Sequence, residues 1–277
     1  MSQVYHMCAD EYWIVDYDIP SEPASKRQAF YRRLNRMLAS LDARGAIDPD
    51  TGLLANSVFW RDLNRAVDRG VPVATFDSDA PASKRFVTYG VDDVLCGAQT
   101  MDELAKLMNG RGVVAILAGN QNAPNLQRRV QGAKEAAKKY PGITIRDTYY
   151  HKETPQDAAA KVEQVMQANP DITGWAFIGG WPLFTDNALK WPAGTVKCVS
   201  VDALPPQLAY VRSGHVEMLL AQDVYGYGQR AVQHLVNKLV LKKNPASPQD
   251  VTPLIAVTKA NVDAYAKNWE KWLPKQP

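Results

Sequence analysis

Apolar and polar positions alternate in blocks along the chain from about residue 58 onward. Leu63, Ala66 and Val67 lie at helical spacing, and Gly70 ends that helix. The continuous apolar run 71–76 comes next and is typical of a buried strand. The same alternation predicts further strands at 112–118, 143–149, 175–178, 196–201 and 216–221. It predicts helices at 101–108, 205–212 and 227–241, and two more helices that begin at 124 and at 154. Strands that alternate with helices predict βαβ units and a parallel sheet, so the fold class is α/β.

Two helix starts carry local signals of their own. Pro124 occupies a first-turn position, where proline is well tolerated, and Leu126, Val130 and Ala133 form the apolar stripe behind it. Thr154 precedes a proline and lies three residues before Asp157, which is the pattern of a capped helix start.

Polar or aromatic residues follow five of the predicted strands. Ligands of open α/β sheets bind beyond the carboxyl ends of the strands, so these positions are candidates for a site. Carboxylates and amides can hold paired hydroxyls, and a flat ring can cover the apolar face of a sugar. Asp and Asn are also common in turns and caps for purely local reasons. The residues are Asp77, Ser78, Asp79, Asn120, Asn122, Gly179, Gly180, Trp181, Asp202, Gln222 and Asp223.

Arg129 lies at the edge of the apolar stripe of its predicted helix, next to Val130. A guanidinium at such a position must find a planar acceptor or extend to water. Both arrangements remain open from the sequence.

Composition narrows the class of protein without naming a function. The chain has 277 residues with 46% apolar and 22% charged residues and a net charge of +3, which gives no case for bulk attraction to nucleic acid or membranes. The three cysteines are odd in number and widely spaced, so they predict neither a disulfide framework nor a metal site. No phosphate loop, nucleophile elbow or zinc signature is present, so we expect no enzyme, no metal and no cofactor. The first residues lack a basic region followed by an apolar one, so no signal peptide is predicted.

Four segments carry a family resemblance: VPVATFDSDAP, GVVAILAGNQNAPNLQRRVQGAKEA, DITGWAFIGGWPLF and VKCVSVDALPPQLAYVRSGHVEMLLAQDVYGYG. They resemble the sugar-binding proteins of bacterial ABC importers, of the ribose, galactose and rhamnose type, over residues 58–277. The resemblance implies a type I periplasmic binding protein fold: two lobes with parallel sheets, joined by a three-segment hinge, that close on a sugar in the cleft. The implied lobes are 1–92 with 224–251 and 93–223 with 252–277.

The resemblance also implies which residues contact the ligand. Asp77 matches the acid that grips sugar hydroxyls, and Ser78 falls where relatives often carry arginine. Gly180 falls where ribose binders carry asparagine, so the ligand need not be ribose. The full implied set is Asp77, Ser78, Asp93, Arg129, Trp181, Asp202 and Gln222. The implied partners are a sugar or polyol and a membrane permease, with an extracytoplasmic location, a monomeric state and no nucleic acid.

Residues 1–57 depart from this family pattern. They offer one good strand, 12–17, and a helix with Phe30, Leu34, Met37 and Leu41 at helical spacing, so one βα unit of the first lobe is predicted to be missing. This segment weakly resembles the opening of small ferredoxin-like CRISPR-associated nucleases, with Asp16 or Asp18 ending the first strand. Two alternatives therefore stay open: a sugar-responsive regulator of the same fold, or a fusion whose N-terminal segment impairs binding or carries a nuclease-like fragment.

Overall fold

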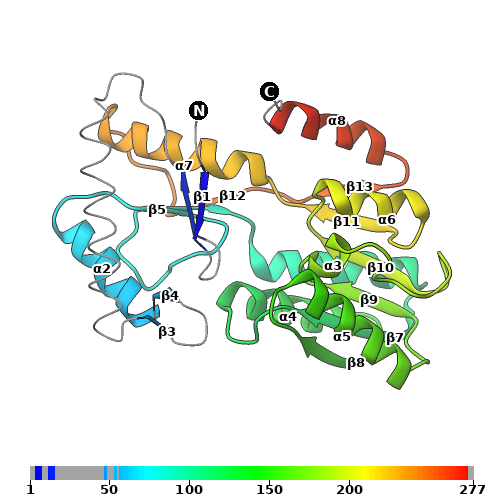
Figure 1. Cartoon of the computed structure of the whole chain (residues 1–277). Helices are drawn as coiled ribbons and strands as arrows, with labels where there is room; N and C mark the ends of the chain where they lie inside the picture. The colour runs from blue at the N-terminus through cyan, green and yellow to red at the C-terminus, as the bar shows by residue number, and fades with distance from the viewer. Residues whose placement is uncertain (1–3, 8–11, 16–46, 49–52, 55, 274–277) are drawn as a thin grey trace. The chain divides into compact units, whose positions relative to one another are not determined.

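The structure is a computed structural model of the chain, and it describes residues 4–7, 12–15, 47–48, 53–54 and 56–273. Contacts divide the chain into two compact units (Figure 1). Unit 1 comprises Met1–Tyr89 and Tyr227–Asp250, and unit 2 comprises Gly90–Gly226 and Val251–Pro277. The chain therefore passes from one unit to the other three times. The predicted helix around Phe30 to Leu41 lies outside the described residues.

Unit 2 is built on a six-stranded sheet with the order β13-β11-β10-β9-β7-β8. All neighbouring strands run parallel except β13, which pairs antiparallel with β11. The strands are β7 (Arg111–Ala118), β8 (Gly142–Tyr150), β9 (Gly174–Phe177), β10 (Lys197–Val201), β11 (Met218–Ala221) and β13 (Ile255–Thr258). The predicted parallel α/β sheet is confirmed, while β13 carried no sequence signal that we recognised.

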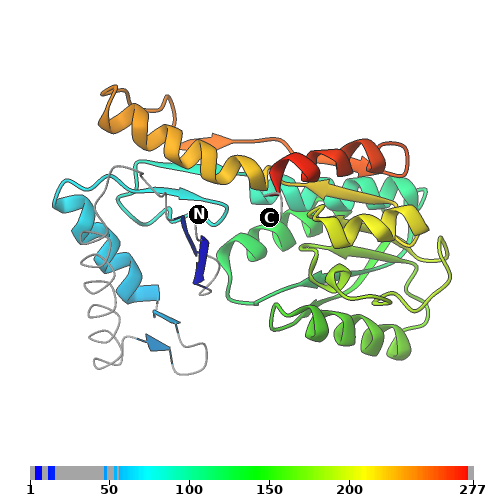
Figure 2. The same cartoon turned by 45° about the horizontal axis from the view of Figure 1, so that its top comes forward.

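The helices of unit 2 cover both faces of this sheet (Figures 1 and 2). They are α3 (Asp93–Leu107), α4 (Pro124–Ala137), α5 (Pro155–Ala168), α6 (Leu208–Ser213) and α8 (Val262–Trp272), with short 3-10 turns η1 (Trp181–Phe184) and η2 (Pro205–Gln207). Successive residues of each strand point to opposite faces. In β7, Val114 and Ile116 pack with α3 and α4, whereas Ala115 and Leu117 pack with α5, α6 and α8. Both faces are buried, which explains the continuous apolar runs of the sequence.

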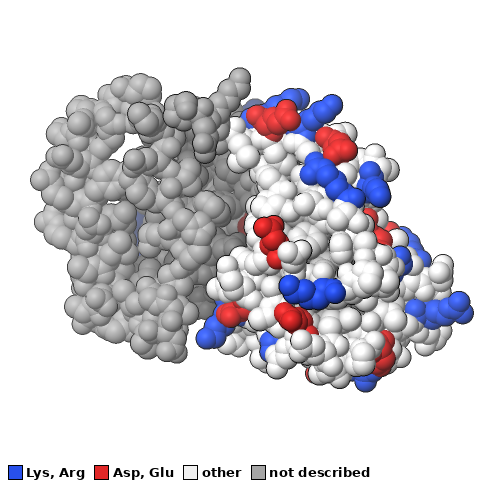
Figure 3. All heavy atoms as spheres, turned by 45° about the vertical axis from the view of Figure 1, so that its right-hand side comes forward, with Lys and Arg blue, Asp and Glu red and all other residues white. Residues whose placement is uncertain are grey.

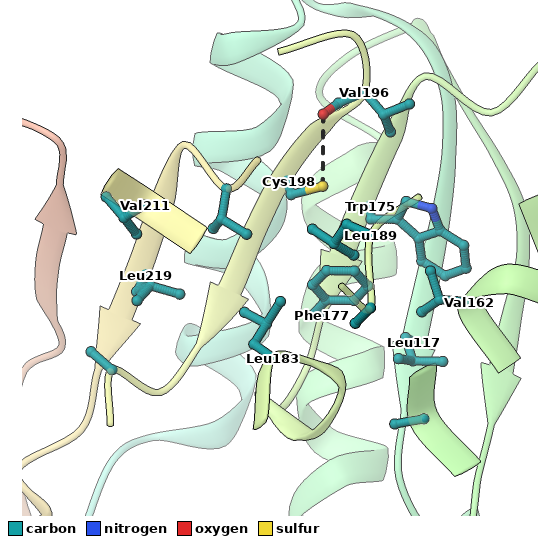
Figure 4. Packing of buried hydrophobic residues seen from close by; sticks show 14 of the residues in the cluster. Leu117, Val162, Trp175, Phe177, Leu183, Leu189, Val196, Cys198, Val211 and Leu219 are labelled. Atoms are coloured by element: carbon teal, nitrogen blue, oxygen red, sulfur yellow. Dashed lines mark hydrogen bonds between the residues drawn. The ribbon is translucent and has the colours of Figure 1, made fainter. Parts of the chain in front are cut away.

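The core on the α5 side centres on two stacked rings (Figure 4). Trp175 and Phe177 of β9 have ring centroids 5.5 Å apart, and both are fully buried. Cys198 of β10 lies beside them with its thiol directed to the carbonyl oxygen of Val196 (Figure 4). Burial raises the pKa of this thiol well above its usual range, so Cys198 packs as an inert apolar side chain.

The predicted helix 101–108 is wrong in its start, because α3 begins at Asp93. The Asp92 carboxylate caps it by accepting the N–H groups of Val94 and Leu95 at 2.9 and 3.0 Å. Gly97 and Thr100 interrupt the apolar stripe of this segment, which hid the first two turns. The starts at Pro124 and at the capping residue Thr154 are confirmed, and the Thr154 Oγ1 accepts from the Asp157 N–H at 3.1 Å.

Unit 1 holds a three-stranded sheet with the order β12-β6-β5. Its strands β5 (Ala74–Phe76) and β6 (Val87–Gly90) are parallel, β12 is Gln249–Val251, and the helices are α2 (Asn56–Asp68) and α7 (Val224–Leu239). Strands β6 and β12 and helix α7 run across the division between the units. The predicted strand 12–17 is present as β2 (Tyr12–Val15), paired antiparallel with β1 (Val4–Met7), and β3 (Ile47–Asp48) pairs with β4 (Leu53–Leu54).

Basic and acidic side chains are interspersed over the coloured face in Figure 3, in keeping with the small net charge of the chain. In the part of the chain that the structure describes, no helix is both long and apolar enough to cross a membrane.

Candidate ligand-binding site

Four of the predicted ligand residues form one continuous hydrogen-bonded network in unit 2. The network runs from Asp93 at the start of α3 through Arg129 of α4 to Gln222 and Asp202, which directly follow β11 and β10. Because these strands are parallel neighbours, their carboxyl ends meet at one edge of the sheet. Residues far apart in the sequence are therefore brought together there.

The Arg129 guanidinium is the centre of the network and is only 3% exposed. Its Nε donates to Asp93 Oδ1 at 3.0 Å, its Nη1 to the Ile178 carbonyl oxygen at 3.3 Å, and its Nη2 to Gln222 Oε1 at 3.0 Å. The planar fork thus meets three acceptors on three elements, which a lysine ammonium cannot do. Of the two arrangements left open by the sequence, the structure shows that Arg129 finds buried acceptors and does not extend to water.

Asp202 lies at the other end of the network and is half-buried. Its backbone is left-handed, with φ of 76°, a conformation that aspartate adopts more readily than most residues but still at some cost. Its Oδ1 accepts from Gln222 Nε2 at 2.7 Å, and its Oδ2 accepts from the Gly180 N–H at 3.1 Å. Strained residues cluster at functional sites, so this conformation supports Asp202 as a site residue.

The charges of the network balance. Asp93 accepts from both Arg129 and Arg128, the latter at 2.5 Å, and the Asp93 and Arg129 side chains are each 4% exposed. With Asp202, the set has two carboxylates and two guanidinium groups. Buried charges that are not paired cost several kcal/mol, and the buried Asp93 carboxylate is paired with both guanidinium groups.

Trp181 is placed by different contacts. Its ring is half-buried, packs against the hydrophobic core and meets the ring of His151 edge to face, with centroids 5.1 Å apart. A Cβ on Gly179 would collide with the Trp181 ring, so the glycine is needed for this placement. Trp181 has no side-chain hydrogen bond to the four network residues, and its contact with ligand stays a prediction.

His151 is buried and accepts the Glu153 N–H on Nδ1 at 2.9 Å. In the neutral ring the proton is then on Nε2. Burial lowers the pKa of His151 to about 4, although the charge of Asp157 opposes the shift. His151 also lines an open groove of about 360 Å³ between the end of β8 and α5, and none of the predicted ligand residues lines this groove.

The two predicted ligand residues of unit 1 follow β5. Asp77 has a left-handed backbone with φ of 58°, as Asp202 has in unit 2, and its Oδ1 accepts from the Tyr227 hydroxyl at 3.1 Å. Ser78 is half-buried. Asp79 forms a forked ion pair with Arg85 and caps its own turn through the Ala80 N–H, so it serves the local role that the sequence left open.

Two further strand-end residues also have local roles. Asn120 accepts the Asn122 N–H on Oδ1 at 2.9 Å, which closes a turn after β7. Asp223 accepts the Gly226 N–H at 3.0 Å in the first turn of α7. These contacts do not need a ligand.

Sequence reasoning missed two residues beside the Asp202 loop. Gln207 is fully buried and contacts both Gly180 and Leu204, but an amide in a PPQ turn gives no signal of burial. Tyr265 of α8 is 7% exposed, and burial together with the charges of Asp202 and Asp223 raises its pKa to about 12. No helix was predicted there, although Val262, Tyr265, Trp269 and Trp272 lie at helical spacing.

Within the described residues, no three His, Cys, Asp or Glu side chains are grouped so that they could hold a metal ion. The groups that the network brings together at the edge of the sheet are amide, carboxylate and guanidinium groups.

The chain thus has two α/β units and a polar network at the carboxyl ends of its parallel strands. The model of the periplasmic binding protein domain family matches residues 62–243, and the chain belongs to that family. The family is one of binding proteins, and the resemblance and the type I fold expected from the sequence are confirmed.

Individual relatives are distant. The xylitol-binding protein of Mycolicibacterium smegmatis is 27% identical over 203 residues, which are 72% of this chain and 57% of that protein. An ABC transporter solute-binding protein from Burkholderia graminis, solved in complex with D-arabinose, is 26% identical with a TM-score of 0.69, covering 83% of this chain and 81% of that one. A sugar-binding protein of a Bacillus halodurans sugar ABC transporter is 25% identical with a TM-score of 0.67, covering 75% and 76%. The matched part of this chain thus spans little more than half of the xylitol-binding protein.

Proposed function

We propose that the chain binds a neutral monosaccharide or polyol at the carboxyl ends of the parallel strands of unit 2. The observation that carries this proposal is the buried network of Asp93, Arg129, Gln222 and Asp202. It places carboxylate acceptors next to amide and guanidinium donors. A sugar hydroxyl both donates and accepts, so adjacent hydroxyls suit this pattern.

The charge of the network supports an uncharged ligand over a sugar acid or a sugar phosphate. An anion would add a negative charge near Asp202, whose carboxylate accepts from two neutral groups, Gln222 Nε2 and the Gly180 N–H, while both guanidinium groups contact Asp93. An unmatched buried charge weakens binding far more than a missing hydroxyl does.

The comparisons support the rest of the proposal. One relative is a xylitol-binding protein, and another was solved in complex with D-arabinose; both compounds are uncharged and polyhydroxylated. We therefore propose delivery of the ligand to a membrane permease of an ABC importer, an extracytoplasmic location, a monomeric chain and no catalytic turnover.

Further ligand contacts are proposed for Asp77 and Ser78 in unit 1 and for Trp181 in unit 2. The left-handed strand-end conformation that Asp77 shares with Asp202 supports its role. The implied lobes 1–92 with 224–251 and 93–223 with 252–277, and the hinge where the chain passes between them, are part of the same proposal.

Isothermal titration calorimetry with matched neutral and charged ligands tests the function. We expect xylitol, D-arabinose or another neutral monosaccharide to bind, and D-glucuronate and glucose 6-phosphate to bind at least tenfold more weakly than the preferred neutral ligand, a difference of about 1.4 kcal/mol. Asp202→Asn should weaken the neutral ligand. Tighter binding of the charged ligands, or release of sugar from a glycoside by the purified chain, would contradict the proposal.

A further inference from the structure

Gln207 connects the loops that follow two neighbouring strands of unit 2. Its side chain is fully buried. The Oε1 atom accepts from the Leu204 N–H at 2.7 Å, in the loop after β10, and the Nε2 atom donates to the Gly180 carbonyl oxygen at 3.1 Å, in the loop after β9. A buried amide with a partner at each end is a rigid link, because losing either partner leaves a buried polar atom unsatisfied.

The segment 202–207 forms a hydrogen bond with each backbone polar group of Gly180, the N–H and the carbonyl oxygen. Its N–H donates to Asp202 Oδ2, and its carbonyl accepts from Gln207. The Leu183 N–H, in the 3-10 turn that follows, donates to the same carbonyl oxygen at 3.1 Å. Glycine has no side chain to fix its backbone, so these three bonds orient its two peptide groups. The carbonyl belongs to the peptide group that leads into Trp181, so the bond from Gln207 helps to orient the start of that residue.

Gly180 and Gln207 are adapted to each other sterically. A Cβ on Gly180 would collide with Gln207 Nε2 and would also lie 3.0 Å from the Val201 carbonyl oxygen. The amide of Gln207 thus occupies the space that a side chain at residue 180 would need.

We propose that Gln207 is a positioning residue of the ligand site, which fixes the Asp202 carboxylate and the start of Trp181 through Gly180. The inference rests on the proposed function, because it assigns Gln207 to the same site. Gln207 itself touches no ligand in this proposal.

Amide hydrogen exchange at Gly180 tests the link without any ligand. Gln207→Met conserves volume and removes both hydrogen bonds, and Gln207→Glu keeps the acceptor for the Leu204 N–H but loses the donor to Gly180. We expect the Gly180 amide to exchange at least about tenfold faster in both variants, while the Leu204 amide is exposed in Gln207→Met alone. Gln167→Met, on the exposed face of α5, is the matched control and should change neither amide.

Affinity for the neutral sugar that binds the unmodified chain provides the second readout. Both Gln207 variants should bind it roughly tenfold more weakly, with the Gln167→Met control unchanged. Faster exchange at Gly180 with unchanged affinity, or unchanged exchange, would overturn the inference. A chain that binds no sugar at all would refute the proposed function, and the exchange comparison would still decide whether Gln207 links the two loops.

Discussion

At the scale of single residues, the buried guanidinium of Arg129 determines where the other polar groups lie. It joins Asp93, the Ile178 carbonyl and Gln222, so α4, the end of β9 and the end of β11 are held by one side chain. Gln222 in turn holds Asp202 at 2.7 Å. These side chains therefore hold one another in a connected set, and preorganisation of this kind would reduce the ordering cost of binding at the proposed site.

Arg129→Lys tests this role directly. Lysine keeps the charge but cannot reach three acceptors in one plane, so buried polar atoms lose their partners. We expect a loss of about 2–4 kcal/mol in the free energy of unfolding, measured with urea, and weaker sugar binding. Arg146→Lys, in the exposed ion pair with Asp171, should cost under about 1 kcal/mol and leave binding intact. Equal effects of the two substitutions would contradict the central role of Arg129.

The buried His151 predicts a pH dependence of stability. Burial holds its folded pKa at about 4, below the value of about 6.5 expected in the unfolded chain. The unfolded state therefore binds more protons between these values, so the stability contribution is present above pH 6.5 and is lost as the pH falls toward 4.

His151→Phe should remove this contribution while it keeps a ring against Trp181. Between pH 7 and pH 5 we expect the unmodified chain to lose about 1–2 kcal/mol more in its free energy of unfolding than the variant does. His215→Gln, at a half-buried histidine that contacts Ser213, is the control and should retain the steeper dependence. The same pH dependence in His151→Phe would show that other groups are responsible.

The sequence indicated candidate site residues where a strand end or a helix stripe constrained the side chain. Strand ends indicated Asp202 and Gln222, the stripe indicated Arg129, and the family resemblance added Asp93. The structure joins these four in one hydrogen-bonded network, and their contact with a ligand stays a prediction. Gln207 was missed because nothing in a short turn indicates that an amide will be buried between two loops. The turn and cap roles of Asp79, Asn120 and Asp223 could not be separated from ligand roles without coordinates.

At the scale of secondary-structure elements, the close contact of α3 with α4 brings Asp93 within reach of Arg129. Two glycines allow this approach. A Cβ on Gly97 of α3 would collide with the Arg129 carbonyl oxygen, and a Cβ on Gly132 of α4 would collide with the Val94 carbonyl oxygen. The helix backbones therefore touch at the positions where side chains are absent.

Gly97→Ala should separate the two helices and weaken both stability and the network. An alanine normally stabilises a helix by up to about 1 kcal/mol relative to glycine, but here overpacking should give a net loss of roughly 1–3 kcal/mol. Gly228→Ala in α7 is the matched control, because its Cβ would have no neighbour within 4 Å, and it should be neutral or stabilising. Chemical denaturation of both variants measures the difference. A stabilising Gly97→Ala would contradict the tight helix contact.

Helices and strands could be predicted where the apolar periodicity and the capping residues indicated the same element. The strands and helices between residues 111 and 221 lie close to the predicted ranges, because buried parallel strands are continuous apolar runs. The first half of α3 and all of β6, β12, β13 and α8 were missed. The short strands have too few residues for a pattern, and Gly97 and Thr100 interrupt the stripe of α3.

At the scale of the whole molecule, the chain forms two units and passes between them three times. The matched family model covers residues 62–243 and so includes parts of both units. The departure of residues 1–57 from the family pattern falls mostly outside the described residues. Whether the chain binds a ligand must therefore be measured on the intact protein, with residues 1–57 included.

Thermal unfolding of the intact chain in the presence of neutral monosaccharides and polyols measures ligand binding by the whole protein. A ligand that binds only the folded state stabilises it by about 2.7 kcal/mol at a concentration 100 times its dissociation constant. We expect at least one neutral sugar to raise the unfolding midpoint of the unmodified chain, and to raise that of Asp202→Asn and Arg129→Lys by less. A cooperative unfolding transition that no sugar or polyol shifts would contradict this expectation.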